Sequence, residues 1–176
     1  MRNGSFAIAA LAVAACAAGN GEVRTAKAAR YRGNPVMMFG ALRGAVAAKY
    51  QIAASDETAL RLETTARWYT PEGLAASERG NDMRDVPDRS VQLKLIVRMV
   101  PDGEPYTVSI EPVMQRYFAG RPNPDKLTAD DPSVPGWATG KVDQLYAAIY
   151  DALEGYAARP PRSATELLPG DAHDRR

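Results

Sequence analysis

Two segments of this sequence alternate strictly between apolar and polar side chains, and this pattern constrains the fold more than any other feature. They span residues 58–70 and 90–100. Because successive side chains of a β-strand point to opposite faces, each segment predicts a strand with one apolar face. An antiparallel sheet covered by helices on one side and open to water on the other fits this alternation. The predicted apolar face carries Leu60, Leu62, Thr64, Ala66 and Trp68, then Val91, Leu93, Leu95, Val97 and Met99.

The sequence Pro101-Asp102-Gly103 predicts a tight turn after the second strand. Proline presets φ at one turn position, and glycine accepts a positive φ at another. Alternating apolar residues follow at Tyr106, Val108 and Ile110, so the two flanking strands are expected to form a hairpin. Pro112 cannot donate a hydrogen bond to a neighbouring strand, which predicts an edge or a bulge at that position.

Two helices are predicted on either side of these strands. Asn34-Pro35 is a good N-cap and first helical residue, and Phe39, Leu42 and Val46 follow with helical spacing toward an end near residues 50–53. Gly40 and Gly44 lie one turn apart, which suggests a smooth groove for another backbone. After a proline-punctuated linker over residues 121–140, Thr139 or Gly140 is expected to cap the second helix. Its apolar stripe is Val142, Leu145, Ile149, Leu153 and Tyr156.

These elements predict an α+β fold with an antiparallel sheet of three to four strands and two helices packed on one face. The expected order is (β)-α-β-β-β-α, where the optional first strand lies near residues 22–26. One domain over residues 34–158 accounts for the pattern. Residues 159–176 are polar and proline-rich, and disorder is expected there.

The first fifteen residues have the organisation of a secretory signal. Met1-Arg2-Asn3 is positively charged, and residues 6–15 are uncharged and apolar. As a helix this run would reach ~15 Å, about half of a ~30 Å hydrocarbon core, so it is too short to span a bilayer. A charged start, a short apolar stretch and small residues together predict export with removal of residues 1–15.

The sequence Val13-Ala14-Ala15-Cys16 resembles the lipobox of bacterial lipoproteins. In such a motif small residues enter the signal peptidase, and the cysteine thiol accepts the lipid. Cys16 is also the only cysteine, so no intramolecular disulfide can form. The alternatives are an ordinary leader cleaved at an Ala-x-Ala site, which would make Cys16 incidental, and a cytoplasmic protein.

The resemblance implies a lipid anchor on Cys16 with two or three acyl chains, which is enough for stable membrane attachment. Position 17 is alanine and not the aspartate typical of inner-membrane retention, which favours the outer membrane, facing the periplasm. Residues 16–33 are then expected to be a tether. Its basic residues could contact phospholipid head groups, or the segment could be a solvated linker. These residues, with one from the following helix, are Arg24, Lys27, Arg30, Arg32 and Arg43.

The charge and residue content give no sign of catalysis, a cofactor or nucleic-acid binding. The chain has 22 basic and 21 acidic residues, so it carries no global attraction for nucleic acid. The only histidine, His173, lies in the C-terminal segment, which argues against a histidine-based catalytic or metal site. Asp82, Asp85 and Asp88 lack the spacing of a calcium loop, and so does the second acidic group. That group is Asp125, Asp130 and Asp131.

Two surfaces are candidates for binding a partner. The long charged segment 71–89 joins two strands, and loops of this length are either functional or floppy connections. The polar face of the sheet is the second candidate, because basic and aromatic side chains are expected there beside Ile96. It could receive an acidic partner or a lipid phosphate, or it could be solvated and offset by Glu63 and Glu111. The predicted binding residues are Arg61, Arg67, Tyr69, Lys94 and Arg98.

The layout of Tyr50-Gln51-Ile52, Asp56, the strand at residues 60–64, the hairpin and the closing helix resembles small helix-on-sheet envelope lipoproteins. Lipoprotein subunits of the outer-membrane barrel-assembly and lipopolysaccharide-assembly machines are similar in plan, which implies a non-enzymatic accessory role by analogy. The leading hypothesis is a lipoprotein that binds an envelope protein or lipid. A carrier of a small apolar ligand and a hydrolase are the alternatives. The carrier's pocket would be lined by Phe39, Trp68, Met99 and Tyr146.

Overall fold

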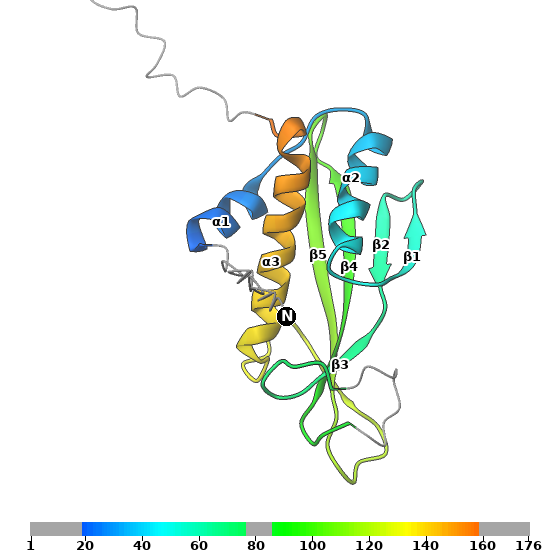
Figure 1. Cartoon of the computed structure of the whole chain (residues 1–176), viewed down its shortest axis with the longest axis vertical. Helices are drawn as coiled ribbons and strands as arrows, with labels where there is room; N and C mark the ends of the chain where they lie inside the picture. The colour runs from blue at the N-terminus through cyan, green and yellow to red at the C-terminus, as the bar shows by residue number, and fades with distance from the viewer. Residues whose placement is uncertain (1–18, 77–85, 159–176) are drawn as a thin grey trace, which may run out of the picture.

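The computed structural model describes residues 19–76 and 86–158, which form an antiparallel six-stranded sheet with three helices on one face (Figure 1). The α+β class and the antiparallel sheet are therefore confirmed, but the predicted numbers of strands and helices are too low. The strand order is β1-β2-β4-β5-β6, and β3 pairs with β4. The strands are β1 (Ile52–Asp56), β2 (Arg61–Thr64), β3 (Arg67–Tyr69), β4 (Val91–Pro101), β5 (Tyr106–Arg116) and β6 (Asp125–Leu127).

The long β4–β5 hairpin is the centre of the sheet, as the sequence predicts. Its register pairs Val91 with Arg116 at one end and Pro101 with Tyr106 at the other. β5 is not the edge strand, because β6 follows it in the strand order. However, β6 pairs only with residues 114–116, so Pro112 has no strand partner on that side among the described residues. The predicted edge therefore holds at Pro112 but not for the whole strand. Nearby, the Tyr146 hydroxyl accepts a hydrogen bond from the Ile110 N–H at 3.1 Å, so this edge offers few free donors to another strand.

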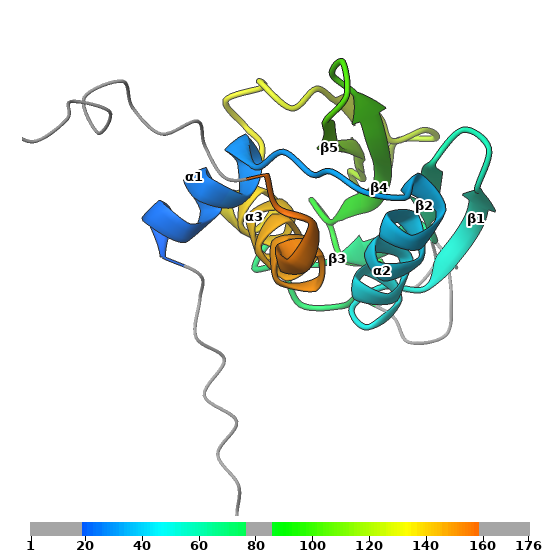
Figure 2. The ribbon, with the colours of Figure 1, turned by 90° about the horizontal axis from the view of Figure 1, so that it is seen from above.

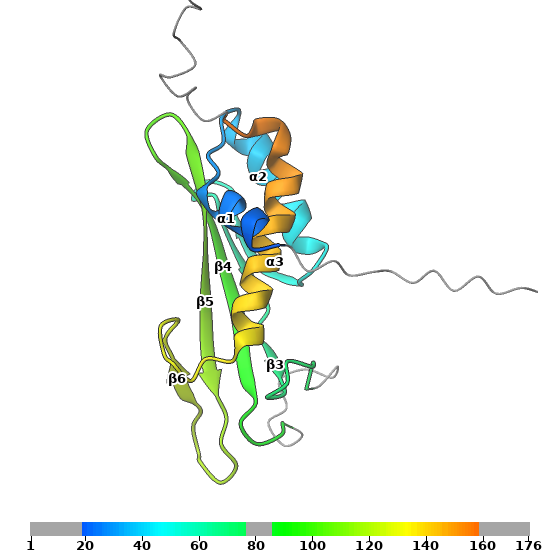
Figure 3. The same cartoon turned by 90° about the vertical axis from the view of Figure 1, so that its left-hand side faces the viewer.

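The three helices form one layer against the apolar face of the sheet (Figure 3). They are α1 (Asn20–Ala28), α2 (Pro35–Ala47) and α3 (Gly136–Leu153), and a single 3-10 turn follows at Glu154–Tyr156. Viewed from above, α3 lies between α1 and α2, and it contacts both (Figure 2). No helix in the described part of the chain is long and apolar enough to cross a membrane.

The core lies between this helix layer and β4, and it follows the predicted alternation. All of its central residues are at most 3% exposed, which accounts for the stability of the layer packing through buried apolar area. They are Val91, Leu93, Leu95, Val97 and Met99 from β4, Met38, Phe39, Leu42 and Val46 from α2, and Leu145, Ile149 and Leu153 from α3.

The predicted cap of α2 is confirmed, because the Asn34 side chain accepts hydrogen bonds from the N–H groups of Val36 and Met37. The suggested backbone groove at Gly40 and Gly44 is not seen among the described residues. A Cβ at either glycine would meet nothing within 4 Å. Both glycines lie on the exposed side of the helix.

The expected strand near residues 22–26 is wrong, because this segment is part of α1. Val23 and Ala26, spaced three residues apart, are buried, and α1 packs against α3. The Glu22 carboxylate accepts a hydrogen bond from the Gly19 N–H at 2.9 Å, which stabilises the start of the helix. The folded part of the chain thus begins within the segment expected to be a tether.

Two strands were absent from the prediction. Residues 50–53 were expected to end a helix, but Ile52 is the first residue of β1. A turn then leads from β1 into β2, and the Asp56 side chain stabilises it by accepting hydrogen bonds from the N–H groups of Thr58 and Ala59. β6 lies in the expected linker. Helix α3 also begins earlier than predicted, at Gly136 after Pro135 and not at Thr139 or Gly140. The expected disorder of residues 159–176 falls outside the described residues.

The expected single strand over residues 58–70 is divided into β2 and β3. At the break, the Thr64 hydroxyl accepts a hydrogen bond from the Leu95 N–H at 2.9 Å, and the Thr65 N–H turns to the carbonyl of Gln51 at 2.8 Å. Pairing with β4 then resumes with Arg67 opposite Leu93. The break shifts the alternation, so side chains after it lie on the face opposite to the predicted one.

Candidate binding site

The structure separates the five predicted binding residues into two groups. Arg61 lies opposite Arg98 in the β2–β4 register. Lys94 precedes Arg98 by four residues in β4 and therefore shares their face of the sheet. Arg67 and Tyr69 lie opposite Leu93 and Val91, whose side chains are in the helix-side core. Because directly opposed residues point to the same face, Arg67 and Tyr69 do not belong to the polar face. The prediction of one common surface is wrong.

We name the polar face of the sheet the open face and define it by Arg61, Glu63, Lys94, Arg98 and Glu111. Its basic residues are paired with carboxylates. Glu63 contacts both Arg61 at 2.5 Å and Lys94 at 2.9 Å. Arg98 lies 3.6 Å from Glu111. The hydrogen bond from Lys94, with further help from Arg61, holds the pKa of Glu63 below its ordinary value. Each of the three cations on the open face therefore has a carboxylate partner, with Glu63 and Glu111 as the predicted counterions.

Trp68 lies on the side of the sheet away from the helices, opposite Gln92. It is 2% exposed, and its ring meets the Tyr117 ring edge-on with centroids 6.3 Å apart. Phe39 and Met99 are in the core on the helix side. The pocket lining suggested for a carrier is therefore divided by the sheet, so Trp68 cannot share a cavity with Phe39 and Met99.

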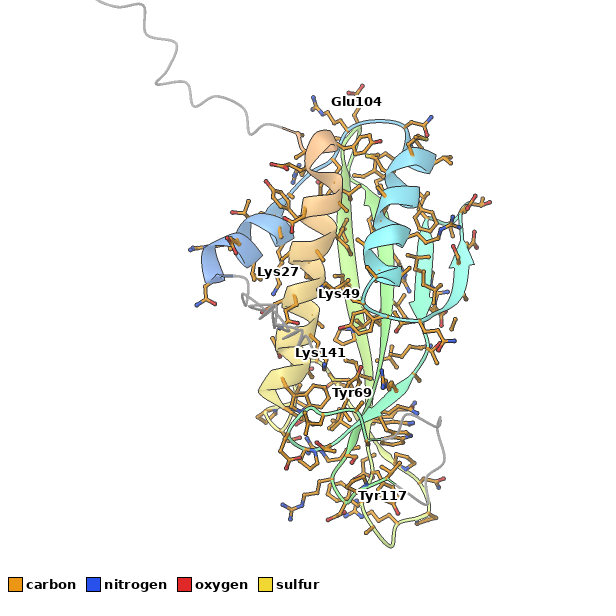
Figure 4. The ribbon with its side chains drawn as sticks, viewed as in Figure 1. Lys27, Lys49, Tyr69, Glu104, Tyr117 and Lys141 are labelled. Carbon is orange, nitrogen blue, oxygen red and sulfur yellow. The ribbon has the colours of Figure 1, made fainter. Side chains whose placement is uncertain are left out.

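A second group of basic and aromatic side chains lies on the helix side, where β3 meets the start of α3. We name it the Lys141 cluster, and its members are Arg67, Tyr69, Trp137 and Lys141. The Lys141 Nζ lies 4.6 Å from the centre of the Tyr69 ring and 6.0 Å from that of Trp137. The two rings are 5.2 Å apart at an interplanar angle of 44°. Figure 4 shows Lys141 and Tyr69 side by side at the lower end of α3.

The first turn of the predicted binding loop holds the Trp137 ring in place. The indole N–H donates to the carbonyl of Pro71 at 2.9 Å. Hydrogen bonds from the Thr70 N–H to Leu74 and from the Gly73 N–H to Thr70 close the turn. Gly73 has φ of +89°, and a Cβ there would lie 2.7 Å from Trp137 Cγ, so this position requires glycine. The rest of the predicted loop up to residue 85 lies outside the described residues.

The charges of the Lys141 cluster are not balanced by the described residues. Burial, followed by repulsion from Arg67, lowers the pKa of the Lys141 ammonium. Arg67 also opposes the effect of burial on the pKa of Tyr69. The two residues lie two positions apart on β3 and therefore share one face of the strand. No carboxylate within residues 19–76 and 86–158 forms an ion pair with Arg67 or Lys141.

The start of α3 adds to this imbalance. Its N-cap is Pro135, which offers no side-chain hydrogen bond, and its first turn contains no acidic residue. A helix N-terminus carries partial positive charge and is ordinarily complemented by an acidic side chain or a cap. Lys141, in the second turn, therefore lies near two sources of positive potential, namely Arg67 and the start of α3.

The described residues contain no group of three histidine, cysteine or carboxylate side chains able to hold a metal ion. Of the acidic residues considered above, Asp88 accepts a hydrogen bond from the Ala119 N–H, Asp125 pairs with Arg121, and Asp131 accepts from the Ser133 N–H. Asp82, Asp85, Cys16 and His173 lie outside the described residues. No protein-family model and no curated protein sequence matches this chain.

The sequence indicates half of this site. Its alternating pattern predicts Arg67 and Tyr69 as binding residues, but on the wrong face, and it gives no prediction for Trp137 or Lys141. The available signal was their spacing: Trp137 and Lys141 lie four residues apart, which places them on one side of a helix if that helix starts before Trp137. The expected start at Thr139 or Gly140 hid this relation.

Proposed function

We propose that this chain is an exported lipoprotein, anchored through Cys16 to the outer membrane and facing the periplasm, that binds another component of the cell envelope. The observation that carries the proposal is the sequence Val13-Ala14-Ala15-Cys16, which follows a short apolar run and contains the only cysteine. The proposal assigns no reaction to the protein, because the sequence lacks a histidine or cysteine that could serve beside a nucleophile or metal in the domain.

The start of the fold supports a role close to the membrane. Gly19 is three residues after Cys16, a distance of ~10 Å at full extension, and α1 begins at the next residue. An acylated Cys16 would therefore hold the domain against the lipid surface with little slack. Ligands at or near that surface would be presented to the protein at high local concentration.

The Lys141 cluster supports binding more strongly than the open face does. Its two cations have no carboxylate partner among the described residues, whereas Arg61, Lys94 and Arg98 each have one. Lys141 is partly buried, whereas Arg67 is exposed. An unpaired, partly buried ammonium favours an external anion because the protein has already removed part of its water. The adjacent turn at residues 70–76 belongs to the loop predicted to bind a partner.

The proposal is tested by intact mass and membrane fractionation of the full chain beside Cys16→Ser. We expect the wild type to lose residues 1–15, to gain acyl mass and to sediment with the outer membrane, and Cys16→Ser to be released. Asn20→Ser, an exposed position just beyond the anchor, is the matched control and should behave as wild type. A soluble, unacylated wild type would contradict the proposal.

A second variant tests the assigned membrane. If Ala17 permits transport to the outer membrane, Ala17→Asp should retain acylation and move the protein to the inner-membrane fraction. Equal distribution of Ala17→Asp and wild type would contradict the outer-membrane assignment while leaving the lipid anchor intact.

A further inference from the structure

The Lys141 cluster has the composition of a site for an anionic ligand. It combines a guanidinium, an ammonium and two aromatic rings from two separate elements, β3 and α3. The ammonium nitrogen lies 4.6 Å from the centre of the Tyr69 ring and 6.0 Å from that of Trp137. A cation–π contact of this kind uses the charge but not all three donors of a lysine. No ion pair within residues 19–76 and 86–158 engages the Lys141 ammonium, so its donors can bind an oxygen from outside.

The cluster is costly to the protein when nothing is bound. Burial and Arg67 both disfavour the charged form of Lys141, and the uncapped start of α3 adds positive potential. An anion between the two cations would offset both the repulsion from Arg67 and the positive potential of the helix start, and would favour the charged form of Lys141. Lys94 provides the internal comparison, since it is also partly buried but has Glu63 at 2.9 Å.

We infer that the Lys141 cluster is a phosphate-binding site, in which Arg67 and Lys141 bind the phosphate oxygens and the Trp137 ring contacts the group that carries the phosphate. Phosphate fits better than a single carboxylate because two cations from separate elements can share several tetrahedrally arranged oxygens. The guanidinium offers a planar pair of donors, and the ammonium offers a compact point charge. A phosphate monoester also carries about −1.5 to −2 charge near neutral pH, which matches two cations.

Two sources of phosphate share this chemistry, namely an anionic lipid head group and a soluble phosphate ester. The inference deepens the proposed function by naming the ligand of the same surface, but the site itself does not require the anchor. It can therefore be tested on the full chain with Cys16→Ser, so that any vesicle binding comes from the domain and not from acyl chains.

The first arm of the test is a titration with glycerol 3-phosphate followed by tryptophan fluorescence. The chain has two tryptophans, so Trp68→Phe isolates the signal of Trp137. We expect saturable binding that weakens at least about tenfold in Lys141→Met and in Arg67→Gln, because each removes a charge-assisted hydrogen bond. Lys141→Arg should retain most of the affinity. Lys94→Met, on the open face, is the matched control and should change the affinity less than twofold.

The second arm measures sedimentation with vesicles of phosphatidylcholine, with and without phosphatidic acid, whose head group is a phosphate monoester. Lys141-dependent binding to phosphatidic acid vesicles identifies a lipid head group as the source. Binding of glycerol 3-phosphate without Lys141-dependent vesicle binding identifies a soluble ester, and both results support the site.

The inference is overturned if glycerol 3-phosphate does not bind, or if Lys141→Met and Lys94→Met bind it equally while both variants retain the wild-type circular dichroism spectrum. Binding of a polyglutamate peptide without binding of glycerol 3-phosphate would also overturn it, in favour of a carboxylate partner. None of these outcomes depends on acylation of Cys16, so failure of the site and failure of the anchor are distinguishable.

Discussion

The open face and the Lys141 cluster are built from similar side chains but treat their charges differently. On the open face each basic residue has a carboxylate within 4 Å, and Glu63 serves two of them. In the Lys141 cluster, Arg67 and Lys141 repel each other and have no such partner among the described residues. Basic composition alone therefore does not identify a binding surface. The presence or absence of an internal counterion separates a solvated sheet face from a site prepared for an external anion.

The largest expected effect concerns the two tryptophans, one near each surface. Trp68→Ala should lower the free energy of unfolding by about 3–5 kcal/mol, because Trp68 is 2% exposed and its removal leaves a cavity. Trp137→Ala should cost less, about 2 kcal/mol, since its ring is only partly buried. Chemical denaturation of both variants measures the difference. If Trp68→Ala does not fold, the smaller change Trp68→Phe should still be more destabilising than Lys94→Met.

A glycine pair tests whether the turn at residues 70–76 is fixed by the Trp137 ring. Gly73 and Gly120 both have positive φ, but only at Gly73 would a Cβ meet another residue within 4 Å. Gly120→Ala should cost about 1 kcal/mol from backbone strain, and Gly73→Ala about 2–3 kcal/mol because the ring must also move. Thermal denaturation provides the comparison. Equal costs would show that Trp137 does not restrain the turn.

The two surfaces should respond to pH at opposite ends of the scale. In the folded protein the pKa of Lys141 lies below its ordinary 10.5. Between the folded pKa and 10.5 the unfolded chain therefore binds more protons than the folded one, so the stability of the wild type rises with pH in this range. The stability of Lys141→Met relative to wild type should therefore fall across this alkaline window. Tyr31 and Tyr50, whose pKa values are raised to about 12, titrate in both proteins and cancel from the difference.

At acid pH, the open face should contribute more than the Lys141 cluster to the pH dependence of the free energy of unfolding. Glu63 has a folded pKa below its ordinary 4.5, so its contribution is fully present above 4.5 and is lost as the pH falls through the folded value. Glu63→Gln should remove this acid-range loss, and Lys141→Met should leave it unchanged. Urea denaturation between pH 2.5 and 6 measures it. The same acid dependence in wild type and Glu63→Gln would contradict the described ion pairs.

The smallest effect is expected for an open-face pair. Arg98 and Glu111 are both well exposed at 3.6 Å, so Arg98→Gln should change the free energy of unfolding by less than about 1 kcal/mol. It should not change the affinity for glycerol 3-phosphate. A loss of affinity as large as that of Arg67→Gln would remove the distinction between the two surfaces.

The sequence predicted those parts of the fold where local pattern and tertiary environment agree. The β4–β5 hairpin and the Asn34-capped helix are of this kind, because alternation or capping at these positions meets no competing interaction. The strand β1 was missed because Ala53, Ala54 and Ser55 have little preference for a strand, and pairing with β2 decides their conformation. Helix α1 was missed because only Val23 and Ala26 anchor it.

The candidate site was harder to predict because it depends on an interruption that the alternating pattern does not reveal. Residues 58–70 alternate without a break, yet hydrogen bonds of Thr64 and Thr65 end the pairing of β2 and shift Arg67 and Tyr69 to the helix side. Trp137 and Lys141 join them only because the turn after β3 folds back onto α3. Both events are long-range contacts, which single-sequence periodicity cannot register.

The most direct test of the central claim compares two lysines in one molecule. Trace acetylation of the full chain near pH 8, quantified by peptide mass spectrometry, reports the fraction of each amine that is deprotonated and accessible. With glycerol 3-phosphate present, the account predicts slower labelling of Lys141, because a bound phosphate both shields the amine and favours its charged form, while labelling of Lys94 stays constant. Unchanged labelling of Lys141, or equal protection of both lysines, would contradict the account.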